Sequence, residues 1–280
     1  MGDKTLDEIS TVLDDFSKQI EKLKNQPAAV DAAFDELASD AAAAEGGALF
    51  GVIGAAVGYA YGSMTGDDFT GYMSEHKQEI KDKIQELLDK LAKAIEALRA
   101  PIALLNTSGD WLKLKSQIGA AQNEEVVNGN LSGYWKGSSA LKYAGARTVQ
   151  DTAMDTAKSI CDTLNKSLVA VSNAAWTYYT DVVKQLVSFL TSFGAAVAKI
   201  ASVVSFTEGV SSAIDLLKTV IDNVVTYMQT LTTALKTEQD AINNISSATD
   251  NAKGFLGNKW PQSASTKFDS DSEGDSWQAE

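Results

Sequence analysis

The chain has 280 residues, of which 44% are hydrophobic, enough for one large or two small cores. Its 37 acidic and 24 basic side chains give a formal net charge of −13, which repels phosphate backbones and excludes nucleic acid as an expected partner. Three prolines and one cysteine argue against a turn-rich β fold, an internal disulfide and a cysteine-based zinc site. An all-α fold is therefore expected.

The N-terminal residues predict two helices. Thr5 and Glu8 have the spacing of a capping box, and a one-sided apolar pattern follows them as far as Leu23. Pro27 is well placed to open a second helix, because the first turn of a helix tolerates a residue without a backbone N–H.

Residues 46–66 form a stretch without charged side chains and rich in glycine. Most of its glycines lie four residues apart, a spacing that lets two helices approach closely; they are Gly47, Gly51, Gly54, Gly58, Gly62 and Gly66. The favoured interpretation is a helix or hairpin buried in a bundle, since so many glycines weaken helix propensity and solubility in hydrocarbon. The alternative is a segment that inserts reversibly into a membrane.

Three further helices are predicted in the middle of the chain. A strongly amphipathic pattern runs from about Tyr72 to Arg99, and a shorter helix is expected at 111–127 after the polar run 106–109. From about Ser138 a nearly continuous apolar stripe extends to Phe193, so this helix should be far longer than average.

The C-terminal part is expected to hold one more helix. Thr207 and Gly209 are interpreted as a break, after which apolar residues recur at helical spacing to about Ala252. The predicted architecture is an elongated helical bundle divided into 1–66, 67–205, 206–257 and a disordered acidic tail at 258–280.

Between the two middle helices stands a motif of one tryptophan, one glycine, a small residue and an aromatic. Its members are Trp135, Gly137, Ala140 and Tyr143. The tryptophan can cover the end of a helical hairpin while the glycine lets the chain reverse. This pattern resembles the WXG superfamily of helical-hairpin proteins, the substrates and partners of type VII (ESX) secretion systems, and the chain's length is similar to that of the larger ESX secretion-associated proteins.

The resemblance implies a W-x-G helix-turn-helix hairpin and a non-enzymatic protein that acts by association. The implied partner is a W-x-G-type protein or a second copy of the chain. The start of the sequence has neither a basic nor an apolar region of a Sec signal peptide, so export by another route is expected, to the exterior or the cell surface. The family's export signal, an aromatic followed four residues later by an acidic residue, does not occur; a partner would supply it, or the route differs.

Two other classes of function remain as alternatives. One is a membrane-active, pore-forming type of helical protein that inserts residues 46–66. The other is an enzyme, for which no motif is found: His76 is the single histidine, and neither nucleotide-binding loop nor catalytic triad can be assembled. Cys161 falls on an apolar stripe and is expected to be an inert buried thiol. No cofactor or metal is predicted, although residues 269–280 partly match a calcium-binding loop.

Overall fold

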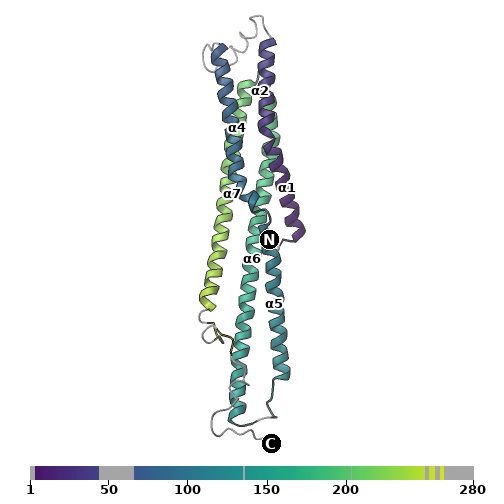
Figure 1. Ribbon diagram of the computed structural model, residues 1–280, viewed down its shortest axis with the longest axis vertical. Coiled ribbons are helices and arrows are strands. Elements are labelled where there is room, and N and C mark those ends of the chain that lie inside the picture. The colour runs from purple at the N-terminus through teal and green to yellow at the C-terminus, as the bar shows by residue number, and fades with distance from the viewer. Residues whose placement is uncertain are drawn as a thin grey trace. The chain divides into compact units, whose positions relative to one another are not determined.

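The computed structural model describes residues 4–43, 66–134, 136–202, 204–249, 252–255 and 259–261 (Figure 1). Within these ranges the chain is mostly helical and contains no strand, so the all-α prediction is confirmed. The helices are α1 (Leu6–Lys24), α2 (Gln26–Ala43), α4 (Gly66–Glu96), α5 (Ala100–Asn128), α6 (Ser138–Ile200) and α7 (Phe206–Thr249).

The predicted start of α1 is confirmed in atomic detail. The backbone N–H of Glu8 donates to the Thr5 hydroxyl at 3.2 Å, and the backbone N–H of Thr5 donates to the Glu8 carboxylate at 2.9 Å. The reciprocal pair satisfies two donors that a helix start would otherwise leave unpaired. Pro27 lies in the first turn of α2, as expected.

The polar run at 106–109 does not interrupt the chain, contrary to the prediction of a shorter helix at 111–127. It lies inside α5, which begins at Ala100. The Thr107 and Ser108 hydroxyls donate to the carbonyls of Ala103 at 2.9 Å and Leu105 at 2.7 Å, so the helix itself satisfies them. Ser108 is buried, and packing overrides the weak helix propensity of these residues.

The long helix is confirmed: α6 begins at Ser138 and extends over 63 residues. The break after it lies a few residues earlier than expected. Residues 201, 202, 204 and 205 lie outside the helices, whereas Thr207 and Gly209 already belong to the first turn of α7. The Ser205 hydroxyl donates to the carbonyl of Lys199 at 3.1 Å, which ties this turn to the end of α6.

The chain forms two compact units. Unit 1 contains Pro101–Asn173 and the residues from Ala234 onward, and unit 2 contains Gly2–Ala100 and Ala174–Thr233. The four-part division predicted from the sequence differs from these two units and stays a prediction.

Unit 2 has a core of aromatic and aliphatic side chains. The ring of Phe16 meets that of Tyr179 edge to face at 5.0 Å, and the ring of Phe206 meets those of Phe34 at 5.8 Å and Tyr72 at 6.0 Å. Such edge-to-face pairs add to the free energy gained from burying the rings. The apolar faces of α1, α2, α4, α6 and α7 therefore meet in one core.

Two neighbouring tyrosines in this core have different hydrogen bonding. The Tyr179 hydroxyl donates to the Ala94 carbonyl near the end of α4 at 2.8 Å. The Tyr178 hydroxyl is buried without a hydrogen-bond partner among the described residues. Burial raises the pKa of both side chains, that of Tyr179 from its ordinary 10.0 to about 12.

We expect unit 2 to lose stability in alkali because of Tyr179. Its pKa is raised in the folded state, so its contribution is complete below pH 10 and is lost as the pH rises through about 12. A shift of that size corresponds to about 2–3 kcal/mol. Urea unfolding from pH 8 to 12 should show this decline, and Tyr179→Phe should make it shallower.

The control for this measurement is Tyr134→Phe, since the Tyr134 side chain is 89% exposed. It should follow the pH curve of the parent chain. A Tyr179→Phe curve that also coincides with the parent would contradict the assignment.

In unit 1, α5 and the first part of α6 run antiparallel (Figure 1). Asn165 donates to the carbonyl of Ser108 at 3.0 Å, and the Ser172 hydroxyl donates to that of Pro101, also at 3.0 Å. Nearer the connection, Lys115 pairs with Asp162 at 2.6 Å. Together with Lys166, Lys115 lowers the pKa of Asp162 to about 2, because both ammonium groups favour the ionised carboxylate.

Candidate functional site

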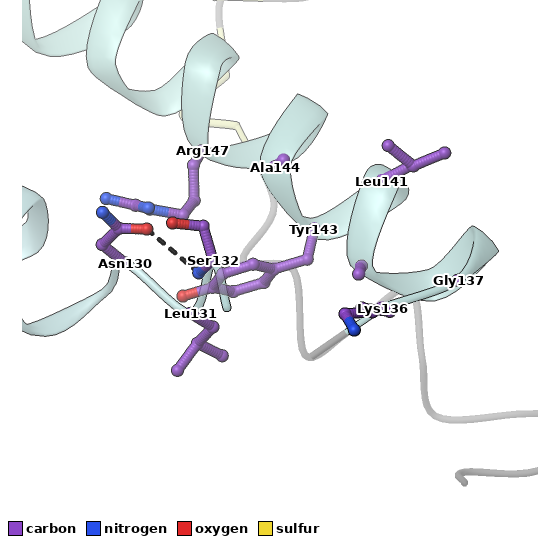
Figure 2. A pocket seen from close by; sticks show the side chains of 10 residues that line it. Asn130, Leu131, Ser132, Lys136, Gly137, Leu141, Tyr143, Ala144 and Arg147 are labelled. Carbon is purple, nitrogen blue, oxygen red and sulfur yellow. Dashed lines mark hydrogen bonds between the residues drawn. The ribbon is translucent and has the colours of Figure 1, made fainter. Parts of the chain in front are cut away.

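A pocket of about 420 Å³ opens where α5 ends and α6 begins. The connecting residues and the first three turns of α6 line it, as Figure 2 shows. The lining mixes apolar and polar side chains, among them Leu131, Leu141, Tyr143, Asn130 and Arg147. A small apolar recess with a few fixed polar groups is the usual form of a binding site in proteins.

Tyr143 and Arg147 fix one wall of this pocket. The Tyr143 hydroxyl donates to the carbonyl of Gly129 at 2.8 Å, which ties α6 to the residue just after α5. The Arg147 guanidinium donates to the Glu125 carboxylate and, at 2.9 Å, to the Glu125 carbonyl. The carboxylate raises the pKa of Arg147 further, so this cation is permanent.

Gly137 gives the chain the backbone conformation that starts α6. Its φ is +100°, in the left-handed region that side chains with a Cβ rarely adopt. Its carbonyl accepts the backbone N–H of Leu141 at 3.2 Å, so α6 follows it directly. A residue with a Cβ at this position would be strained even though the space beside it is open.

Several apolar side chains between the end of α5 and the first turn of α6 are exposed, and two of them, Leu131 and Leu141, line the pocket. We call them the apolar rim: Val126, Val127, Leu131, Tyr134 and Leu141. Leu141 is 77% exposed and Tyr134 is 89% exposed. Single exposed apolar residues are ordinary, but a group of them close in sequence, two of which line a recess, is typical of an interaction surface.

Three of the four predicted motif residues line the pocket: Gly137, Ala140 and Tyr143. Trp135, the fourth, lies outside the described residues. Leu141 and Arg147 also line the pocket but were not predicted from the sequence. Leu141 could have been noticed as an apolar residue off the apolar stripe of α6, whereas the pairing of Arg147 with Glu125 spans 22 positions and leaves no local signal.

The second predicted set falls almost wholly outside the described residues, namely Gly47, Gly51, Gly54, Gly58 and Gly62. Gly66 is the first residue of α4. The prediction of close helix packing at this segment therefore stays a prediction.

Within the described ranges, no group of three or more His, Cys, Asp or Glu side chains could hold a metal ion. The His76 ring is partly buried against the Tyr72 ring, with 4.2 Å between the ring centroids, and its Nδ1 lies 3.0 Å from the Glu79 carboxylate. Cys161 is buried, and burial raises the pKa of its thiol, which suits an unreactive side chain.

No protein-family model, no curated protein and no solved structure matches this chain. The resemblance to the WXG superfamily thus rests on the motif residues alone.

Proposed function

We propose that this chain is a non-enzymatic protein of the type VII (ESX-like) secretion class that acts through protein association at the connection between α5 and α6. The observation that supports this best is the exposed apolar rim, of which Leu131 and Leu141 line the same pocket as Gly137, Ala140 and Tyr143. Removing such side chains from water on binding is favourable by about 25 cal/mol for each Å² of apolar surface.

The proposed partner is a W-x-G-type protein or a second copy of the chain. The pocket wall is already held by Tyr143 and Arg147, so a partner would meet a preformed surface and would lose little free energy in ordering it. Under this proposal the protein is exported without a Sec signal peptide, or is held at the cell surface, after synthesis in the cytoplasm.

Leu141→Asp tests the role of the apolar rim. Leu141 lies in the first turns of α6, where a negative side chain is compatible with the helix dipole, so the helix should remain intact. Binding to a W-x-G partner encoded by a neighbouring gene, or self-association in its absence, should weaken by roughly fivefold or more.

The matched control is Leu112→Asp on α5, because Leu112 is also exposed, at 46%. Isothermal titration or analytical ultracentrifugation measures the binding, and circular dichroism checks the fold. Export should also stop when the secretion ATPase of the native host is inactivated. Equal association for both variants, or undiminished export without the ATPase, would exclude the proposal.

A second candidate is a membrane-active protein that inserts residues 46–66. The helices on either side of this segment, α2 and α4, favour this candidate because ion pairs join them. Lys77 of α4 pairs with Asp31 at 3.2 Å and with Asp35 at 3.1 Å, both on α2. An uncharged segment joining two paired helices could enter a bilayer as one hairpin.

The helix α6 adds little to that candidate. Within the described residues it is the one helix long and apolar enough to cross a membrane, but buried core helices of soluble proteins meet the same criteria. Leakage of dye from liposomes separates the two functions. Leakage that Gly58→Asp abolishes would favour membrane insertion, and intact liposomes would favour association.

A further inference from the structure

The surface around the pocket is basic in a chain that is otherwise strongly acidic. Residues 126–150 contain Lys136, Lys142 and Arg147 and no acidic side chain, whereas the whole chain has a formal net charge of −13. Lys136 and Arg147 also line the pocket, where the charge of Arg147 is balanced by its ion pair with Glu125. The first turn of α6, which follows Gly137, holds no acidic residue either. Positive side chains and the backbone N–H groups of a helix start both favour a negatively charged occupant.

A segment of matching character lies in the same chain. Residues 262–280, here called the terminal segment, contain five acidic side chains and one basic one, Lys267. The acidic residues are Asp269, Asp271, Glu273, Asp275 and Glu280. Two large aromatic residues, Phe268 and Trp277, accompany them. The composition thus complements both the basic side chains and the apolar rim.

The chain is fastened to α6 shortly before the terminal segment begins. Gly254 has a φ of +86°, and a Cβ there would lie 2.6 Å from the backbone nitrogen of Ala153, so this backbone lies directly against α6. The Thr156 hydroxyl donates to the carbonyl of Lys253 at 3.0 Å. The ring of Trp260 then packs on Phe255 at 5.6 Å.

This fastening brings the terminal segment within reach of the pocket. Ala153 and Tyr143 are ten positions apart on one helix, which corresponds to about 15 Å at 1.5 Å per residue. Nineteen extended residues can span up to roughly 60 Å. All of these contacts lie within unit 1.

We propose that the terminal segment 262–280 docks on the pocket of its own chain, with its carboxylates beside Lys136 and Lys142 and its aromatic side chains on the apolar rim. Each exposed ion pair contributes little alone, about 0–1 kcal/mol. Attachment to the same chain supplies an effective concentration on the order of millimolar, so weak contacts are sufficient. The inference needs no partner; if the proposed function also holds, the segment competes with the partner for the same surface.

Zero-length crosslinking of the full chain tests the docking directly. Carbodiimide joins an ammonium group to a carboxylate only when the two are in contact. Mass spectrometry of the monomer should find Lys136 or Lys142 joined to the acidic residues of the terminal segment. Lys113 serves as an internal reference, since its side chain is 79% exposed and it lies on α5, and its crosslinks to the segment should be rarer.

A second measurement follows the motion of the segment. A nitroxide is attached to Ser276→Cys, while the native Cys161 is buried and should stay unlabelled. Reversing two charges with Lys136→Glu and Lys142→Glu should increase the mobility of the label severalfold, as should high salt. The control pair Lys113→Glu and Lys184→Glu changes the net charge by the same amount at exposed positions. These two substitutions should leave the mobility of the label unchanged.

Crosslinks that appear only between chains, or a label mobility unaffected by the Lys136 and Lys142 reversals, would overturn the docking. An unchanged label mobility would not bear on association with a partner, whereas crosslinks only between chains would support a second copy as the occupant of this surface. A chain that docks its terminal segment but binds no W-x-G protein and no second copy would instead exclude the proposed function alone.

Discussion

Phe206→Ala is expected to destabilise unit 2 by roughly 3–5 kcal/mol, the usual range when a buried aromatic side chain is truncated. Phe206 is the first residue of α7, is 2% exposed, and packs its ring on Phe34 of α2 and Tyr72 of α4. Its loss would leave a cavity where three helices meet. Thermal and urea unfolding should both report the change, with a midpoint lower by about 6–20 °C.

Val187→Ala is the control for Phe206→Ala. Val187 belongs to the same unit on α6 but is 46% exposed, so its truncation should change the free energy of unfolding by less than about 1 kcal/mol. Similar losses for the two variants would contradict the packing described for α7.

Trp135→Ala and Gly137→Val are expected to fail in different ways. An aromatic anchor at an interface often contributes 2 kcal/mol or more, so the first variant should keep its helices but bind a partner about 30-fold more weakly and be exported poorly. The second should lose roughly 1–3 kcal/mol of stability, because valine is strained at the φ of +100° that Gly137 adopts.

Circular dichroism melts, partner titration and culture-supernatant assays distinguish the two effects. Gly145→Ala is the matched control: this glycine lies inside α6 with open space at its Cβ, so alanine should stabilise the helix by about 0.5–1 kcal/mol. If Trp135→Ala binds and is exported like the parent, the type VII proposal loses its main residue-level support, and membrane insertion becomes the leading candidate.

Helix starts were predictable wherever the signal is local. The capping box of Thr5 and Glu8 and the start of α6 near Ser138 follow from residues within one turn of each other, and the structure has both. The polar run 106–109 misled the prediction, because its hydroxyls bond to their own helix and Ser108 is covered by α6. This burial is caused by residues nearly sixty positions away, so the local sequence does not predict it.

The candidate site was predictable only in part for the same reason. The motif drew attention to Gly137, Ala140 and Tyr143, and these residues share one pocket. The pairing of Glu125 with Arg147 depends on the register between α5 and α6, which apolar periodicity alone does not fix. The run of basic residues between 126 and 150 was present in the sequence and is the signal that could have singled out this surface.

The two adjacent tyrosines of α6 have opposite value for engineering a more heat-resistant protein. The Tyr178 hydroxyl is buried with no hydrogen-bond partner in the described part of the chain, and leaving such a group unsatisfied costs about 1–3 kcal/mol. Tyr178→Phe removes that cost and keeps the ring that packs on Tyr179 at 5.2 Å. Tyr179→Phe would instead leave the Ala94 carbonyl without its donor, so a thermostable design should change the first tyrosine and retain the second.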